Sequence, residues 1–370
     1  MKTKAAVLWG LNEPWSVEEI ELGDPVAEEV RVKLAASGLC HSDEHIVTGD
    51  IPNYLPVVGG HEGAGVVDAV GADVVRVKPG DHVVLSFIPS CGKCRWCATG
   101  HQNLCDLGAA INQGPAVADG TFRRTARGKE TAAMCQIGTF SPYVVCHEAS
   151  VVKIDDDIPL DKAALVGCGV TTGWGSAVYA ADVQAGETVV VVGIGGVGIN
   201  AVQGASLAGA RHVIAVDPVE YKREQAKLRG ATHVAPDADA ALAIVRDLTW
   251  GAMADKAIIT TDVARGSLIA PVMSLVGKTG RVVVTAIAPA AQTQVDLSLI
   301  ELTLFQKELR GALFGASNPQ ADIPKLLRLY RDGLLKLDEL VTRTYPLEDI
   351  NQGYQDMRDG INVRGVVLYD

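Results

Sequence analysis

The sequence predicts an α/β protein with two parts, a β-rich part followed by a doubly wound parallel sheet. The first 150 residues contain short apolar runs, such as "EEVRVKLAASG" and "GDHVVLSF", bounded by Gly, Pro and Asp, as is typical of strands and turns. From about residue 170, apolar strands alternate with segments of helical period, which predicts a parallel sheet covered by helices. At 370 residues the chain is long enough for two domains.

The parallel sheet is predicted from four apolar strands and the helices between them. "ETVVVVG" and "HVIAVD" have the composition of buried strands, and "DKAIIT" and "RVVVTAI" follow later. Between the first two strands, Val197, Ala201 and Ala205 recur at helical spacing, and "VEYKREQAKLRG" is expected to form a second helix. Beyond about residue 312 we expect an amphipathic helix, "DIPKLLRLYRDG", and a final strand, "GVVLYD". The stretch 106–139 has little clear period and is expected to be a long loop.

The charge and hydropathy of the chain exclude several classes of function. The formal net charge is −11, which disfavours binding to nucleic acid or to an anionic membrane surface. The N-terminal "MKTKAAVLWGLNEPW" has only a brief apolar stretch, too short for a secretory signal. The longest apolar run, "TVVVVGIGGVGI", is broken by glycines and cannot span a bilayer. We therefore expect a cytoplasmic enzyme or binding protein.

Four of the eight cysteines crowd into fifteen residues, at Cys91, Cys94, Cys97 and Cys105. Disulfides are disfavoured because no export signal is recognised and the cytosol keeps thiols reduced. An iron–sulfur cluster shares the C-x2-C-x2-C spacing, but ferredoxins place the fourth cysteine closer than the seven-residue gap found here. Four thiolates close a tetrahedral zinc shell with no open position. The spacing therefore favours a structural zinc, and the chemistry is expected elsewhere.

A glycine motif lies between the first predicted strand of the parallel sheet and its helix. Gly193, Gly195 and Gly198 form G-x-G-x-x-G, which allows a tight turn and a close approach of the main chain to a pyrophosphate. Asp217 ends the next strand, 19 residues past Gly198, where it can accept hydrogen bonds from the adenosine ribose and repel a 2′-phosphate. No arginine immediately follows it, so NAD is favoured over NADP. The alternative is a glycine-rich turn beside a helix-capping aspartate.

Cys40, His61 and Cys168 are candidates for a second metal site. They lie in "GLCHSDEH", "GGHEGAG" and "VGCGVTTGWG". A set of two cysteines and one histidine leaves the fourth zinc position open for water or substrate, as in catalytic zinc sites. Spacing alone leaves the alternative open, because a single buried cysteine is often a small core residue and a single histidine a hydrogen-bonded one.

The chain resembles the zinc-dependent alcohol dehydrogenases of the medium-chain dehydrogenase/reductase superfamily over essentially its whole length. "GLCHSD", "GHEGAG", the Cys91–Cys105 loop, "GCGVTTG", "GIGGVG" and "NVRGVV" match that family in order. The resemblance implies a GroES-like catalytic domain at 1–169 and 313–370, interrupted by a Rossmann domain at 170–312. It also identifies segment 91–105 as the structural zinc lobe of the family. The implied cofactors are two zinc ions per subunit and NAD.

The resemblance also implies roles for individual residues. Cys40, His61 and Cys168 look like the catalytic zinc ligands. Four further catalytic positions are implied. Asp43 orients the ring of His61, and Glu62 is the carboxylate behind the metal. Ser42 takes the substrate proton, and His45 relays that proton to solvent.

Other residues are implied to bind the cofactor or the substrate. His41 and Arg364 match positions near the pyrophosphate, and Lys222 matches a ribose contact. Thr172, Gly196 and Val197 complete the expected cofactor site, while Phe87 and Phe140 fall at substrate-pocket positions. For His41, Lys222 and Arg364 the alternative is an exposed surface charge, and for the two phenylalanines it is core packing.

The implied reaction is oxidation of an alcohol to an aldehyde or ketone, with hydride transfer to NAD. Zinc lowers the pKa of the alcohol, as it does that of bound water, and NAD supplies the redox chemistry. "CHSDEHIVTGD", "LSFIPSCGKC" and "LKLDELVTR" look like the nicotinoprotein group, which depends on the dye N,N-dimethyl-4-nitrosoaniline (NDMA) and keeps NAD bound through turnover. The implied partners are a small alcohol or aldehyde, an external electron acceptor and further copies of the chain, as a dimer or tetramer.

The sequence leaves several alternative functions open. A glutathione-dependent formaldehyde dehydrogenase is disfavoured by Ile51, where that group has an acidic residue, and by His45, which that group lacks. An ordinary alcohol dehydrogenase that exchanges NAD is a second alternative. A zinc-free reductase of the same superfamily and a non-catalytic NAD-binding protein are disfavoured by the candidate ligands and by the Ser42–His45 pair. Cys135 and Cys146 fit no ligand pattern.

Overall fold

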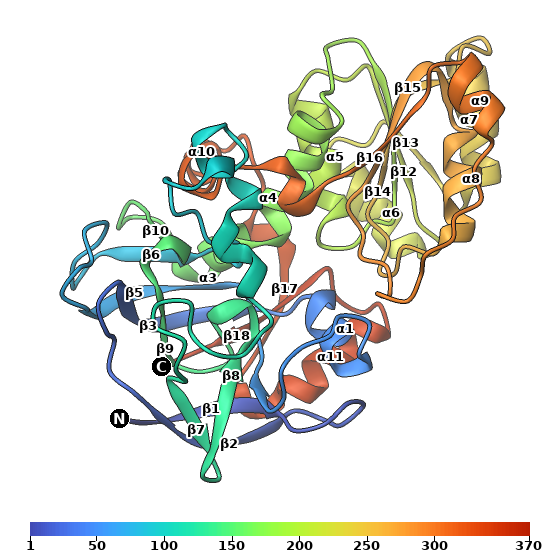
Figure 1. The fold of residues 1–370 in the computed structure, drawn as a ribbon. Helices are drawn as coiled ribbons and strands as arrows, with labels where there is room; N and C mark the ends of the chain where they lie inside the picture. The colour runs from blue at the N-terminus through green and yellow to red at the C-terminus, as the bar shows by residue number, and fades with distance from the viewer. The chain divides into compact units, whose positions relative to one another are not determined.

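The computed structural model describes all 370 residues and divides them into two compact units (Figure 1). The first unit comprises Met1–Cys168 and Asn318–Asp370, and the second comprises Gly169–Ser317. The predicted domain borders lie one residue and five residues from these divisions. The larger difference arises because the short helix η8 (Leu313–Ala316) packs on α4 (Gly169–Gly175) inside the second unit.

The first unit contains a small closed barrel of five strands. Both faces of β1 are buried, because Ala5 and Val7 face one apolar cluster while Ala6 and Leu8 face a larger one, as the two-residue period of a strand requires. The barrel closes through a short strand that pairs with β1 on one side and with β8 on the other. The strands, in barrel order, are β1 (Lys2–Leu8), β2 (Ser16–Leu22), β7 (Arg124–Ala126), β8 (Lys129–Ala133) and β4 (Val57–Val58).

A second sheet in the first unit joins residues from both ends of the chain. Its central strand β3 pairs with β5 along one edge and, along the other, with β9 and then with β18 from the C-terminal segment. Figure 1 shows β17 and β18 in red beside the blue N-terminal strands. The strands are β10 (Val151–Lys153), β6 (His82–Leu85), β5 (Gly63–Val70), β3 (Glu29–Gly38), β18 (Arg364–Leu368), β17 (Val341–Tyr345) and β9 (Tyr143–His147).

The helices of the first unit are short, apart from one in the C-terminal segment. α1 begins after the N-cap Cys40, carries acidic residues in its first turn, and ends at Gly49, whose φ is 80°, a conformation that favours glycine. The α-helices are α1 (His41–Thr48), α2 (Arg95–Ala98), α3 (Leu160–Ala163), α10 (Pro319–Arg331) and α11 (Ile350–Arg358). The 3-10 helices are η1 (Gln102–Leu104), η2 (Asp106–Ala110), η3 (Met134–Gln136), η4 (Glu148–Ser150), η5 (Ala164–Gly167), η9 (Asp338–Leu340) and η10 (Leu347–Asp349).

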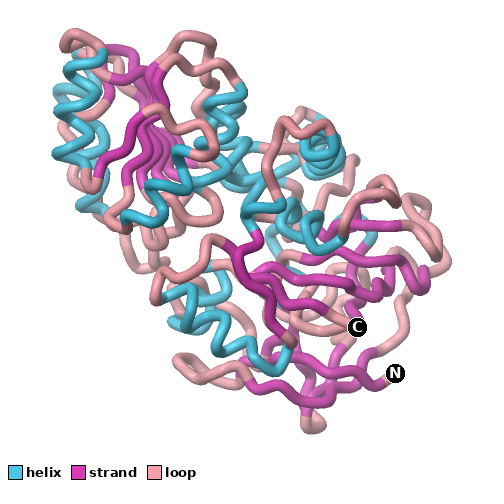
Figure 2. Tube along the Cα trace, turned by 180° about the vertical axis from the view of Figure 1, so that it is seen from behind, coloured by secondary structure: helices cyan, strands magenta, loops and turns pink.

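The second unit is a six-stranded parallel sheet with helices on both faces (Figure 2). Every residue of its central strand β11 is buried, as a strand covered on both faces should be. In sheet order the strands are β13 (His233–Ala235), β12 (His212–Val216), β11 (Thr188–Val192), β14 (Ala254–Ile259), β15 (Val276–Val284) and β16 (Glu308–Gly311). Besides α4 and η8 the helices are α5 (Gly198–Leu207), α6 (Glu220–Lys227), α7 (Ala238–Leu248), α8 (Ile269–Met273), α9 (Leu299–Leu304), the π-helix η6 (Ser176–Ala180) and the 3-10 helix η7 (Gly266–Leu268).

The predicted fold class is confirmed, with one local correction. The four predicted strands of the parallel sheet form β11, β12, β14 and β15, and the expected final helix and strand form α10 and β18. The stretch 106–139 is not one long loop, because it supplies β7 and β8 to the barrel. These strands have three and five residues, too few for a clear two-residue period in the sequence. None of the helices has the length and hydropathy needed to cross a bilayer.

Candidate metal and nucleotide sites

One buried cluster unites the residues of the expected catalytic metal site. One ligand atom from each of Cys40, His61, Glu62 and Cys168 lies within 4.8 Å of the others. The four residues come from the N-terminus of α1, the segment before β5 and the end of η5. Gly60 turns the chain toward the cluster with a φ of 84°, and a Cβ there would lie 2.5 Å from the Thr139 hydroxyl oxygen. Side chains 128 positions apart, from 40 to 168, thus meet at one point.

The ring of His61 is held in one orientation by Asp43. Nδ1 of His61 lies 3.0 Å from Oδ1 of Asp43, and the Gly60 N–H donates to the same oxygen over 3.2 Å. The other carboxylate oxygen accepts from the Cys40 N–H at 3.2 Å and from the Tyr354 hydroxyl at 2.6 Å. Asp43 has no exposed surface, so this network is shielded from water.

The cluster has the chemistry of a zinc site. Nε2 of His61 is buried and has no hydrogen-bond partner, which is costly unless a ligand takes its lone pair. A hydrogen bond from Cys168, together with the charge of His61, lowers the pKa of the Cys40 thiol well below its usual range. The same hydrogen bond and burial raise the pKa of Cys168. Two thiols and one imidazole held in this way fit a catalytic zinc, whose thiol ligands must ionise.

Glu62 lies beside the same cluster and forms an ion pair with Arg364. Burial raises the pKa of Glu62 to about 7 although the charge of Arg364 opposes the rise. Nη2 of Arg364 also donates to the Leu39 carbonyl over 3.0 Å, and Arg364 is buried. The structure therefore directs this Arg364 nitrogen at Glu62, and a pyrophosphate contact stays a prediction.

The second cysteine cluster contains no histidine or carboxylate. The Sγ atoms of Cys91, Cys94, Cys97 and Cys105 all lie within 4.8 Å of one another. Main-chain N–H groups of Cys91, Cys94 and Cys97 donate to sulfur atoms of the set at 3.3–3.5 Å, and N–H donors of Asp106 and Cys97 lower the pKa of Cys94 to about 6. Four thiols held by main-chain donors fit a closed structural zinc site.

The expected proton relay begins beside Cys40. The hydroxyl of Ser42 lies 3.8 Å from the Cys40 sulfur. The ring of His45 lies edge-on to that of His41 at 5.1 Å. His45 is only 2% exposed, and its role in relaying a proton to solvent stays a prediction. Its Nδ1 lies 3.1 Å from Oδ2 of Asp50. Asp50 is not among the site residues predicted from the sequence.

The two phenylalanines expected in a substrate pocket differ in their surroundings. The ring of Phe87 is half-buried and lies edge-on to that of His61 at 5.8 Å. Phe140 has no exposed surface and packs against Trp15 and Tyr354, at 5.6 and 6.2 Å between ring centroids. This packing favours the core alternative for Phe140, and its place in a substrate pocket stays a prediction.

The glycine motif forms the turn between β11 and α5 in the second unit. Gly193 has a φ of 91°, and a Cβ there would lie 2.6 Å from the Thr261 nitrogen. A Cβ on Gly198 would lie 1.9 Å from the Gly193 carbonyl, whereas a Cβ on Gly195 would meet nothing within 4 Å. The outer glycines are thus required by packing, and the middle one leaves open space of the kind that a pyrophosphate needs. Gly196 and Val197 complete the turn, and Val197 is the N-cap of α5.

Asp217 is tied to this turn by its carboxylate. Oδ2 accepts from the Ile194 N–H at 2.8 Å, and Oδ1 accepts from the Val219 N–H at 2.9 Å. Arg223, a nearby cation in α6, donates to the Asp217 and Pro218 carbonyls. Lys222 is half-buried on the same helix. The arrangement presents an acidic group at the end of β12, as NAD-binding sites do.

Thr172 is a further member of the expected cofactor site in the second unit. It lies in α4, it is 8% exposed, and its hydroxyl oxygen is buried with no hydrogen-bond partner. An unsatisfied buried hydroxyl is consistent with a site that receives a polar ligand.

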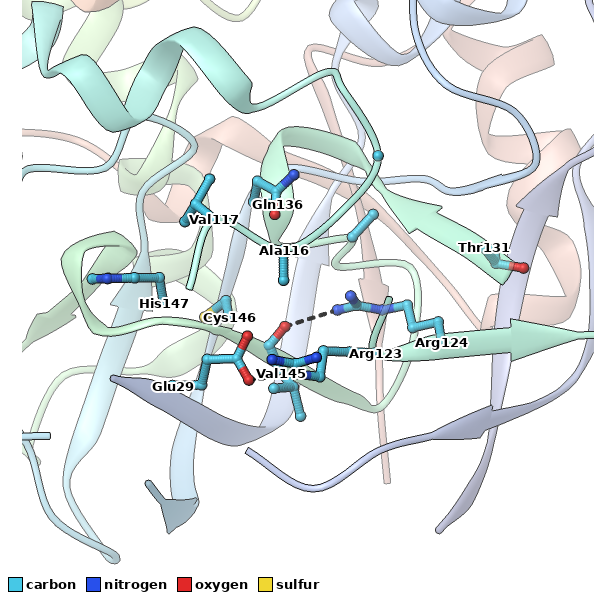
Figure 3. Close-up of a pocket in the computed structure, with 12 residues that line it drawn as sticks. Glu29, Ala116, Val117, Arg123, Arg124, Thr131, Gln136, Val145, Cys146 and His147 are labelled. Carbon is cyan, nitrogen blue, oxygen red and sulfur yellow. Dashed lines mark hydrogen bonds and ion pairs between the residues drawn. The ribbon is translucent and has the colours of Figure 1, made fainter. Parts of the chain in front are cut away.

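A third polar cluster lies around a cavity of about 10 Å³ in the first unit (Figure 3). Nε of Arg123 donates to Glu29 over 2.6 Å, and Nη2 of Arg124 donates to two main-chain carbonyls at 3.1 Å. Burial lowers the pKa of Arg124 to about 10 and raises that of Cys146 to about 12. The cavity has room for about one water molecule. Neither Cys146 nor Cys135, which is also buried, belongs to a metal-ligand cluster.

Comparisons with known proteins identify the family of the chain. Residues 26–156 match the alcohol dehydrogenase GroES-like domain, and residues 196–332 match the zinc-binding dehydrogenase domain. The chain is 56% identical to alcohol dehydrogenase B of Mycobacterium tuberculosis over 370 residues, covering 100% of this chain and 99% of that protein. It is 55% identical to the NDMA-dependent alcohol dehydrogenase of Amycolatopsis methanolica over 369 residues, with coverage of 100% and 99%.

Solved structures of similar fold belong to the same family of dehydrogenases. The benzyl alcohol dehydrogenase of Acinetobacter calcoaceticus superimposes with a TM-score of 0.91 at 31% identity, covering 100% of both chains. An alcohol dehydrogenase zinc-binding domain protein from Burkholderia ambifaria gives 0.93 at 34% identity, covering 100% of this chain and 99% of that one. The chain therefore belongs to the zinc-dependent, NAD-dependent alcohol dehydrogenases of the medium-chain dehydrogenase/reductase superfamily.

Proposed function

We propose that the protein oxidises a small alcohol to an aldehyde or ketone at the Cys40–His61–Cys168 cluster and that NAD stays bound between turnovers. The observation that carries the site assignment is the buried Nε2 of His61, which has no protein partner and lies in a cluster with the thiols of Cys40 and Cys168. Zinc held there supplies a Lewis acid for the alcohol oxygen, and NAD supplies the hydride acceptor.

The surrounding residues orient the ligands and move the proton. Asp43 fixes the tautomer of His61 by accepting from Nδ1, so that Nε2 keeps the lone pair for the metal. Ser42 lies next to Cys40 and takes the hydroxyl proton of the alcohol, and His45 receives that proton from the Ser42 side. Phe87, edge-on to His61, provides an apolar wall that excludes water from the reacting group.

The Cys91–Cys105 cluster holds a second zinc with a structural role. Its four sulfurs lie within 4.8 Å of one another; as ligands of one zinc they would close its shell and leave no position for substrate. Two zinc ions per subunit with different functions follow from the two ligand sets.

NAD is preferred over NADP because Asp217 presents a carboxylate at the end of β12. The 2′-phosphate of NADP would be repelled by this negative charge, which the main-chain N–H donors of Ile194 and Val219 hold in place. His41, Lys222, Arg364 and Thr172 are the further cofactor contacts that we propose.

The proposal that NAD stays bound is supported by similarity to the NDMA-dependent alcohol dehydrogenase of Amycolatopsis methanolica, 55% identical over its full length. The test is to desalt the purified protein and add an alcohol without adding NAD. NADH absorbance close to one equivalent per subunit should appear, and NDMA should then restore the oxidised form. NAD-free protein that turns over steadily with added NAD would instead be an ordinary exchanging enzyme.

We further propose that the protein is a cytoplasmic homo-oligomer. On α9 the side chains of Leu299, Ile300 and Leu304 are 70%, 67% and 69% exposed, and exposed apolar residues clustered in this way indicate an interface. Strand β16 is also at the edge of its sheet. Light scattering on the purified protein should give the mass of a dimer or tetramer, and Leu304→Lys should lower it.

A further inference from the structure

The ring of His45 is buried, so it needs a negatively charged partner in order to hold a second proton. Its side chain is 3% exposed. A histidine that receives a proton becomes a cation, and a buried cation is costly unless a negative group lies beside it. Oδ2 of Asp50 lies 3.1 Å from Nδ1 of His45, and the Asp50 side chain is 26% exposed. The structure therefore places a partly solvated carboxylate against a buried ring.

The position of Asp50 is set by the end of α1. Gly49 adopts a left-handed conformation with a φ of 80°, which turns the chain back along the last turn of the helix. The Ile51 N–H then donates to the His45 carbonyl over 3.0 Å. The Thr48 hydroxyl donates to Oδ2 of Asp50 over 2.8 Å. The carboxylate is thus held by the main chain and by a neighbouring hydroxyl while it faces the ring.

The same helix provides a second example of this pairing. Asp43 of α1 holds His61 through Nδ1 at 3.0 Å, and Asp50, just past the end of α1, holds His45 through Nδ1 at 3.1 Å. A carboxylate at Nδ1 fixes the imidazole as the Nδ1–H tautomer, which puts the ring lone pair on Nε2. In the first pair the lone pair is available to bind a metal, and in the second it is available to accept a proton.

We propose that Asp50 is a positioning residue for proton transfer, which sets the tautomer of His45 and stabilises its protonated form. The inference rests on the proposed alcohol oxidation. A proton that arrives at Nε2 makes the ring an imidazolium beside Asp50, and the ring is neutral again when a proton leaves it for water on the side of the partly exposed Asp50 carboxylate. No electron is transferred in this step.

Two titratable neighbours of His45 on α1, His41 and Glu44, make contacts of a different kind. The ring of His41 lies edge-on to His45 and brings no negative charge. Glu44, also on α1, is engaged by Arg358 of α11 over 2.6 Å. Glu44 therefore offers a matched control, because it is an acidic residue of the same helix with a partner of its own.

The test compares Asp50→Asn with Glu44→Gln in the zinc-loaded, NAD-containing protein. We expect Asp50→Asn to lower kcat for alcohol oxidation about 10- to 100-fold, the scale of changes next to catalytic groups, with KM, zinc content and NAD content unchanged. Asp50→Glu, which keeps the carboxylate, should retain more activity than Asp50→Asn. Glu44→Gln should match the parent.

A double-mutant cycle separates positioning from simple stabilisation. In a His45→Gln background, Asp50→Asn should have no further effect on kcat, because the ring it acts through is gone. Three results would overturn the role of Asp50 and leave the alcohol oxidation standing. They are additive losses of kcat in the double mutant, a kcat for Asp50→Asn equal to that of Glu44→Gln, and an Asp50→Asn protein that has lost zinc or its fold. A parent protein that holds zinc and NAD but oxidises no alcohol would overturn the proposed function and this inference together.

Discussion

The hydroxyl of Tyr354 donates to Oδ2 of Asp43 over 2.6 Å, while Oδ1 of the same carboxylate holds His61. Tyr354 lies in α11, 311 positions along the chain from Asp43. The C-terminal segment thus supports a candidate metal ligand near the N-terminus through one fully buried hydrogen bond.

Tyr354→Phe should weaken zinc binding at the Cys40 cluster. Loss of the donor leaves Asp43 less firmly held, and changes of this kind lower metal affinity about 10- to 100-fold. The free energy of unfolding should also fall by about 1.5–3 kcal/mol. Competition with a chelator measures the affinity. Tyr345→Phe is the matched control, because Tyr345 donates to Asp356 over 2.7 Å away from the metal ligands, so it should affect stability and not zinc.

The two zinc clusters should respond differently to loss of one cysteine. Cys94→Ser opens a shell of four thiols and should lower the thermal unfolding temperature sharply, because structural zinc contributes directly to folding. Cys168→Ser should remove turnover and one zinc per subunit while the circular dichroism spectrum stays that of the parent. Metal analysis and thermal melts check both. A fully active parent with one zinc per subunit would contradict the two assignments.

The buried ion pair between Arg123 and Glu29 should be essential for stability (Figure 3). Their side chains are 7% and 1% exposed, so Glu29→Gln removes the buried partner of Arg123 and leaves it only Asp119, whose side chain is 39% exposed, at a cost of about 1–3 kcal/mol. Asp24→Asn is the control, because Asp24 pairs with Arg31 while 86% exposed and should cost no more than about 1 kcal/mol. Urea unfolding of the two variants should give this order, and equal losses would be inconsistent with the burial argument.

Replacement of Asp217 should change the nucleotide preference. Asp217→Ala removes the carboxylate that we propose as the partner of the adenosine ribose and also the acceptor for the Ile194 N–H. Combined with a basic residue at position 218, it should raise affinity for NADP relative to NAD, as measured by binding to protein stripped of nucleotide. If the parent already binds both nucleotides equally, Asp217 does not set the preference.

Local patterns in the sequence carried most of the successful predictions. The fold class and the family follow from short segments whose spacing is itself the signal, such as the Cys91–Cys105 loop and the Gly193–Gly198 turn. The cysteines that motifs place far apart, at 40 and 168, could be grouped only through the family resemblance, and the structure brings them together.

What the sequence could not predict depends on contacts between distant segments or on one backbone conformation. The ring contacts of Phe140 could not be predicted, because its partners, Trp15 and Tyr354, are far from it in the chain. The contact between Asp50 and His45 could not be predicted, because it requires the left-handed turn at Gly49. The pairing of Glu62 with Arg364 spans 302 positions, and no local pattern reports such a distance.

The sheet of the first unit is interrupted in sequence by the whole second unit, and this sets an order of events on the ribosome. Cys40, His61 and Cys168 emerge early, but β18, which pairs with β3 at Ala36–Gly38, emerges last. Until then that stretch of β3 is an unpaired edge of the kind that other chains can join. The nascent protein therefore exposes its metal ligands before their supporting strand exists, and the second unit can complete its own folding while the first still waits for its final strand.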